Sequence, residues 1–164
     1  MRIYLPSTTT ELATLRDTEA LPGPRPATAV TAELQAWYAD PEVDELEYAA
    51  LLEAARLSLR KVDADPSAGR RRVVIAAEVP ETATEPDPGT GRASVRLLRR
   101  LELSDVVALH VDGVDAEPAI AAAAALVIEA DLGSDDAQFT VDEAEAHELG
   151  WYATQELGPL LELL

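Results

Sequence analysis

The chain contains no cysteine, and it has little lysine, histidine or aromatic residue. Among its 164 residues there are one lysine, two histidines and 4% aromatic side chains. Without cysteine there can be no disulfide framework and no thiolate zinc site, so a metal ion could be held only by histidines and carboxylates. The chain also lacks a glycine-rich phosphate loop between a strand and a helix. We therefore predict no metal and no cofactor.

Long hydrophobic runs are absent as well. The longest, residues 119–130, is mostly alanine and is shorter than the roughly 18 to 20 residues that a membrane span requires. The first residues show no basic leader followed by an apolar stretch, so we expect a cytoplasmic protein with no membrane segment. The length and the hydrophobic content of 48% are typical of one globular domain, residues 1–164.

Positive charge is scarce and unevenly placed. The net charge is −18; residues 56–100 carry 10 of the 13 basic side chains, whereas residues 101–164 carry 15 acidic ones and no lysine or arginine. An acidic surface repels phosphate backbones, which favours a basic protein partner and argues against direct nucleic-acid binding unless the arginines of residues 70–72 and 92–100 form a separate patch. Mimicry of nucleic acid by ordered carboxylates is a variant of the same hypothesis.

The hydrophobic pattern alternates between expected strands and expected helices. Apart from Glu78 and His110, residues 73–79 and 106–111 are apolar, which is typical of strands buried on both faces. We predict a single α/β domain with a mixed, partly parallel sheet of about four to five strands, covered by about five helices. Residues 81–92 are expected to form a flexible loop rich in proline and glycine. The other expected strands are residues 2–6, 27–30 and an edge strand at 94–98, and the expected helices are residues 9–19, 31–38, 41–62, 117–130 and 141–155.

The last expected helix carries the first candidate site. On a helix, Glu143, His147 and Trp151 fall at i, i+4 and i+8 and share one stripe. A carboxylate beside an imidazole can orient the ring and raise its basicity for proton transfer. Trp151 and Tyr152 could then contact a ligand. The same pattern also fits a surface pair on a helix whose two aromatic residues anchor it to the core.

A second candidate site lies at predicted strand ends. His110 closes an apolar strand beside Asp112, and Ser7, Thr8 and Glu78 also lie at or near strand ends. If the three strands are parallel, these side chains gather at the edge where open α/β sheets bind ligands. The alternative is structural, with Ser7 and Thr8 capping the next helix and His110 serving the sheet alone.

Segments along nearly the whole chain carry a resemblance to a known family: residues 2–6, 29–31, 37–38, 45–50, 71–77 and 136–156. In these segments the chain resembles a family of small actinobacterial proteins that share a domain of unknown function. The resemblance implies a single cytoplasmic domain from an actinobacterium, and it supplies no activity, cofactor or catalytic residue.

Two hypotheses of function follow. The leading one is a non-enzymatic interaction or regulatory module that binds a basic partner through its acidic surface, chiefly residues 101–164. The alternative is a small acid/base enzyme of hydrolase or isomerase type, which would use Glu143 with His147, or His110 with Asp112.

Overall fold

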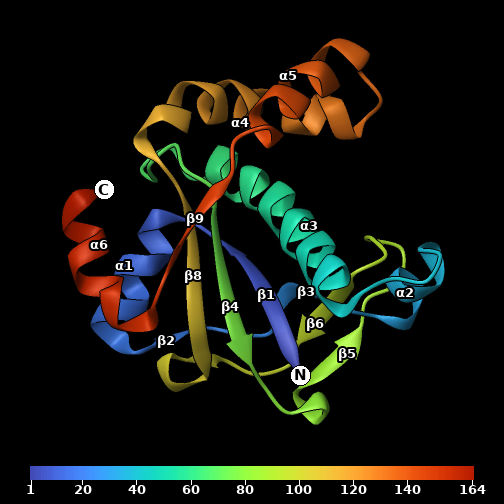
Figure 1. Cartoon of the computed structure of the whole chain (residues 1–164). Helices are drawn as coiled ribbons and strands as arrows, with labels where there is room; N and C mark the ends of the chain where they lie inside the picture. The colour runs from blue at the N-terminus through green and yellow to red at the C-terminus, as the bar shows by residue number, and fades with distance from the viewer.

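The computed structural model describes residues 1–164, and its centre is an antiparallel sheet of seven strands (Figure 1). The strand order is β5-β6-β3-β1-β4-β8-β9, and every neighbouring pair is antiparallel. A separate two-stranded ladder pairs β2 with β7. The strands are β1 (Arg2–Ser7), β2 (Ala20–Leu21), β3 (Arg25–Ala29), β4 (Val73–Glu78), β5 (Thr84–Pro86), β6 (Ser94–Leu97), β7 (Leu101–Glu102), β8 (Val106–Asp112) and β9 (Leu149–Tyr152).

Six α-helices surround the sheet. One face is covered by α3 with α2 beside it, and the other is covered by α1 and α6 (Figure 1). The hairpin of α4 and α5 lies beyond the end of α3. None of the helices combines the length and the apolar character needed to cross a bilayer. The helices are α1 (Thr9–Thr18), α2 (Ala32–Trp37), α3 (Val43–Ala64), α4 (Glu117–Asp131), α5 (Asp135–Glu145) and α6 (Leu157–Leu163).

The long helix α3 lies close to the sheet because its inner face is made of small residues. Ala50 and Ala54 are fully buried against the strands. Ser58, also buried, donates to the carbonyl of Ser7 and accepts from the amide of Val73, so it joins the helix to two strands. A larger residue at position 58 would push α3 away from the sheet.

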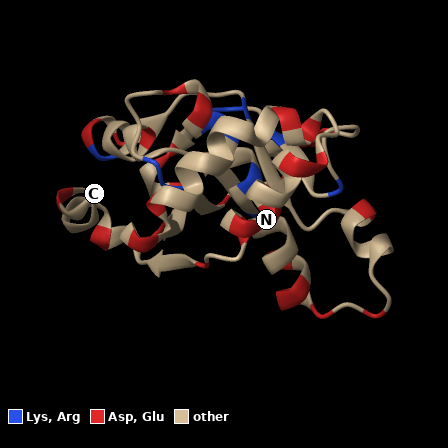
Figure 2. Ribbon diagram, turned by 90° about the horizontal axis from the view of Figure 1, so that it is seen from above, with Lys and Arg blue, Asp and Glu red and all other residues tan.

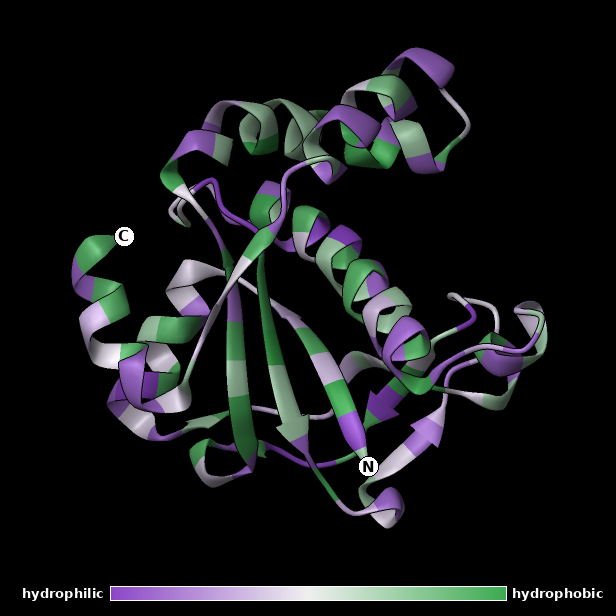
Figure 3. Cartoon of the chain, viewed as in Figure 1, coloured by the Kyte–Doolittle hydropathy of each residue, from purple (hydrophilic) through white to green (hydrophobic).

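The opposite face of the sheet carries the largest apolar cluster. Leu12 and Leu15 of α1 pack with Leu157 and Leu160 of α6 against inward-facing residues of β1, β4 and β8. Figure 3 shows the resulting concentration of hydrophobic residues along these central strands. A third cluster joins α4 and α5 to the C-terminal half of α3.

The predicted partly parallel sheet of four to five strands is wrong. The register of β1 with β4 runs from Arg2 opposite Glu78 to Ser7 opposite Val73, which is antiparallel. The apolar runs of β4 and β8 report burial on both faces, which helices on both sides of an antiparallel sheet produce equally well. Burial therefore gave no information on strand direction.

Three further local predictions need correction. Residues 94–98 are not an edge strand, because β5 pairs with the outer side of β6. The range 81–92, predicted to be a flexible loop, contains the strand β5. The helix expected over residues 141–155 ends at Glu145, and residues 149–152 form β9 on the far side of β8. The strands β1, β3, β4, β6 and β8 and the helices α1 to α4 lie close to their expected positions.

Candidate binding groove between α3 and β9

Strand β9 forms one edge of the main sheet. Its inner side pairs with β8, with Trp151 opposite His110 and Leu149 opposite Asp112. It is the last strand in the order, so its outer side has no strand neighbour. Because side chains alternate along a strand, Leu149 and Trp151 share the face that looks toward α3.

A groove of about 190 Å³ runs between this face and the flank of α3. We call it the α3–β9 groove. Tyr48 and Leu52, which line it from α3, are exposed at 52% and 40%. Trp151 is not a lining residue, but it lies two residues from Leu149 on the same face of β9 and is 62% exposed. Three large apolar side chains thus stand open to solvent on α3 and β9. Its lining residues are Tyr48, Leu51, Leu52, His147, Glu148 and Leu149.

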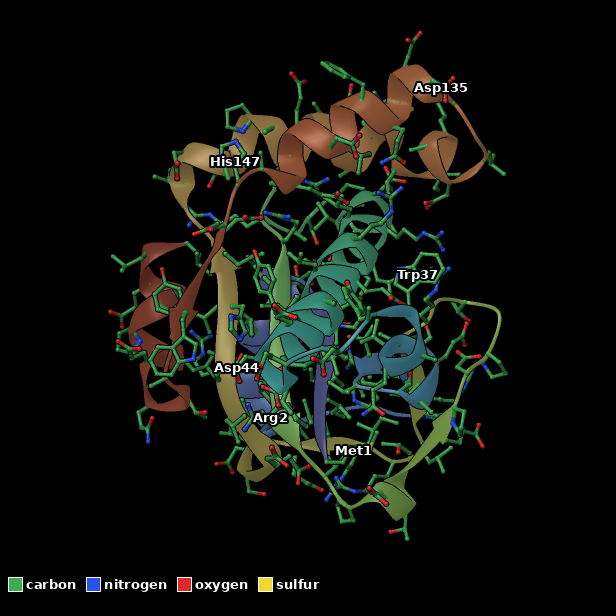
Figure 4. All side chains as sticks on the ribbon, turned by 45° about the vertical axis from the view of Figure 1, so that its right-hand side comes forward. Met1, Arg2, Trp37, Asp44, Asp135 and His147 are labelled. Atoms are coloured by element: carbon green, nitrogen blue, oxygen red, sulfur yellow. The ribbon has the colours of Figure 1, made fainter.

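Carboxylates accompany these apolar residues. Glu148 lines the groove, and Asp44 precedes Tyr48 by one helical turn on the same stripe of α3. Figure 4 shows His147 at one end of this flank, with Asp44 and Arg2 toward the other. Arg2 is a cation at that end, but its Nε donates to Glu78 Oε1 at 2.7 Å. The uncompensated charge of the groove is negative.

His110 faces the same side of the sheet as Trp151. Burial lowers the pKa of His110 below its ordinary value, and the positive charge of Arg2 lowers it further. Burial therefore favours the neutral form of this imidazole. Because residues opposite one another on antiparallel strands have adjacent side chains, His110 and Trp151 form a mixed polar and aromatic pair.

Asp112 does not act together with His110. Its side chain is fully buried, and its carboxylate accepts from Arg72, with Nε to Oδ2 at 2.9 Å and Nη2 to Oδ1 at 2.8 Å. The same Nη2 donates to the carbonyl of His147 at 2.7 Å. Arg72 thus fastens the segment before β9 to the centre of the sheet, and Asp112 serves as its counter-ion.

Glu143 and His147 are not brought together on one helix. Glu143 lies on α5 and is exposed, whereas His147 follows the end of that helix and lines the α3–β9 groove. No hydrogen bond or ion pair joins the two side chains. Tyr152 faces the opposite side of the sheet from Trp151 and packs against the main apolar cluster.

The remaining predicted residues are divided between two ends of the sheet. Ser7 and Thr8 lie at the end of β1, where Ser7 donates to Glu11 and the hydroxyl of Thr8 caps α1. Glu78 lies at the other end, opposite Arg2. The expected gathering of Ser7, Thr8 and Glu78 in one polar cleft required parallel strands, and the antiparallel register separates Glu78 from the other two.

Sequence reasoning missed the contribution of α3 to this site. Tyr48 and Leu52 lie one turn apart on α3, outside its buried stripe, and large apolar residues on the outer side of an amphipathic helix were the available signal. It also missed Arg72, because that residue is the last of three consecutive arginines, and arginines that flank an apolar strand are usually solvated. No group of three or more histidines and carboxylates is arranged to hold a metal ion.

A family model for proteins of unknown function (DUF6912) matches residues 1–161, and the chain belongs to that family. No curated protein and no solved structure matches the chain.

Proposed function

We propose that this member of a family of unknown function is an interaction module that binds an extended, basic segment of a partner protein at β9 and the α3–β9 groove. The observation that carries the proposal is an open edge strand whose exposed Trp151 shares a face with Leu149, a lining residue of the acidic, partly apolar α3–β9 groove. The three features occur together at one place on the molecule.

The edge of β9 can supply backbone hydrogen bonds. An exposed edge strand presents unpaired N–H and C=O groups, and extended peptides add to such edges as a further strand. Natural proteins commonly protect edges with lysine or proline, and β9 (Leu-Gly-Trp-Tyr) has neither. The other edge strand of the main sheet, β5, ends in Pro86, which makes it the poorer template.

Side chains of the groove can supply specificity. Tryptophan and tyrosine are enriched among residues that dominate binding energy, because they bury a large area at little entropic cost. Trp151 and Tyr48 would contact apolar side chains on one face of the added strand. Leu52 extends this apolar surface along α3.

Charge selects a basic partner. Glu148 and Asp44 flank the apolar residues, and residues 101–164 contain no lysine or arginine to neutralise them. Figure 2 shows acidic positions spread over the helices and loops of the view from above, with fewer basic ones. Complementary charge raises the association rate and disfavours acidic competitors.

Fluorescence of Trp151 can test the proposal directly. The chain has two tryptophans, so the Trp37→Phe variant leaves Trp151 as the sole reporter. A ten-residue peptide alternating lysine and valine is expected to shift its emission to the blue in a saturable manner, since the ring becomes buried. The same peptide with glutamate in place of lysine is expected to leave the emission unchanged.

Two matched controls separate groove binding from general attraction. Trp151→Phe, in which Trp37 is the reporter, should show no shift. Glu148→Gln should weaken binding of the lysine peptide more than Asp135→Asn does, because Asp135 lies at the distant tip of the α4–α5 hairpin (Figure 4). Equal effects of the two neutralisations, or equal binding of both peptides, would overturn the proposal.

A further inference from the structure

A second cavity, remote from β9, is lined by cations. It has a volume of about 240 Å³ and lies between α3 and the strands β1, β3 and β6. Arg25, Arg60 and Lys61 line it together with a single carboxylate, that of Asp87. Pro6, Leu57 and Val95 add apolar walls. In a chain of net charge −18, a cavity dominated by positive side chains is unusual.

Arg25 is the most buried of these cations. Its side chain is 8% exposed, and it makes one hydrogen bond, from Nη2 to Glu11 Oε2 at 2.9 Å. Its Nε is buried without any acceptor. A guanidinium carries five N–H donors, and buried donors without acceptors are costly. Arg25 therefore retains donor capacity that the protein itself does not use.

Glu11 is the only ion-pair partner of both Arg25 and Lys61. Lys61 Nζ lies 2.8 Å from Glu11 Oε1, and neither cation has another salt bridge. Burial alone would raise the pKa of Glu11, but the charge of Arg25 and the hydrogen bonds from Lys61 and Ser7 lower it below its ordinary value. One carboxylate thus balances two cations, and one positive charge beside the cavity is left without a counter-ion.

We propose that this cavity binds a small organic monocarboxylate. Its carboxylate would supply the missing negative charge to Arg25 and Lys61, and its apolar body would pack against Pro6, Leu57 and Val95. The volume lies below the roughly 300–1,000 Å³ of sites for drug-sized ligands, so the ligand must be small. The paired N–H donors of arginine match a carboxylate geometrically, and the single unbalanced positive charge favours a monoanion over a more highly charged phosphate.

The test uses benzoate, its neutral analogue benzamide and inorganic phosphate as probes, with amide chemical shifts of ¹⁵N-labelled protein as the readout. Benzoate is expected to shift the amides of Arg25, Ser94 and Val95 in a saturable manner. Benzamide should leave them in place, and phosphate should bind more weakly than benzoate. Equal response to benzoate and benzamide, or saturation by phosphate alone, would overturn the proposal.

Two variants connect the response to the cavity. Arg25→Lys keeps a cation for Glu11 but removes the forked donor of the guanidinium. This variant is expected to weaken the affinity for benzoate about tenfold or more. The matched control Arg99→Lys, at a surface pair with Asp105, should bind as the parent does. Leu57→Trp fills the cavity without touching Glu11, so benzoate binding by that variant would contradict the site even if Arg25→Lys fails to fold.

Discussion

Arg72 and Asp112 form a doubly hydrogen-bonded ion pair in the core, with side-chain exposures of 1% and 0%. The pair joins β4 to β8, and through Nη2 of Arg72 it also binds the carbonyl of His147 just before β9. A contact between residues 40 positions apart thus positions the edge strand on which the proposed interaction site depends.

Removing one partner of this pair should destabilise the fold strongly. Arg72→Met leaves the Asp112 carboxylate buried without a counter-ion, a change that typically costs about 3–5 kcal/mol. Urea unfolding measures the loss. The exposed pair of Arg99 with Asp105 is the matched control, and Arg99→Met should cost less than about 1 kcal/mol. Recovery of part of the lost stability in the double variant Arg72→Met/Asp112→Leu would identify the unpaired charge as the cause.

Glu11 should make the stability fall at acid pH. Its folded-state pKa lies below the ordinary value of 4.5, so the unfolded chain binds the proton more readily. The stabilisation is therefore present above pH 4.5 and is lost as the pH falls through the folded-state pKa. Glu11→Gln should flatten this part of the profile of unfolding free energy against pH, whereas Glu143→Gln, at an exposed position, should leave the profile as it is.

His110 should titrate below its ordinary value of 6.5. Because burial opposes the charged form, the unfolded state binds the proton first, and stability is lost as the pH falls from 6.5 through the folded-state pKa. NMR titration of the imidazole protons measures this pKa. Arg2→Met should raise it, since a neighbouring positive charge is removed, while Arg16→Met should not. An imidazole that titrates at or above 6.5 would contradict the described burial.

Arg56 should hold the α4–α5 hairpin against α3. Its guanidinium donates to Asp131, Gln138 and Glu145, which lie on both helices of the hairpin. Arg56→Met should lower stability by about 1 kcal/mol and accelerate amide hydrogen exchange in α5. Arg60→Met is the control, because Arg60 contacts Asp131 alone and is half exposed; an equal acceleration in both variants would refute the bracing role.

Local elements could be predicted from the sequence, whereas their pairing could not. The cap at Thr8 and the periodic small residues of α3 are patterns between positions close together in the sequence. Helices α1 and α3 could therefore be predicted. The direction of β4 and β8 could not, because an apolar run reports burial alone. Residues 149–152 were predicted to be helical because they follow a true helical pattern. Four residues are too few to reveal the alternation of side chains that marks a strand. The residues that build the groove come together only through the pairing of β8 with β9.

The central claim is that β9 accepts a basic segment as an additional strand. The most direct measurement is amide hydrogen exchange at residues 149–152, with and without a saturating amount of the peptide that alternates lysine and valine. The outward amides of β9 should then exchange more slowly, because new backbone hydrogen bonds protect them. Unchanged exchange in β9, with protection appearing on α4 and α5 instead, would contradict the account.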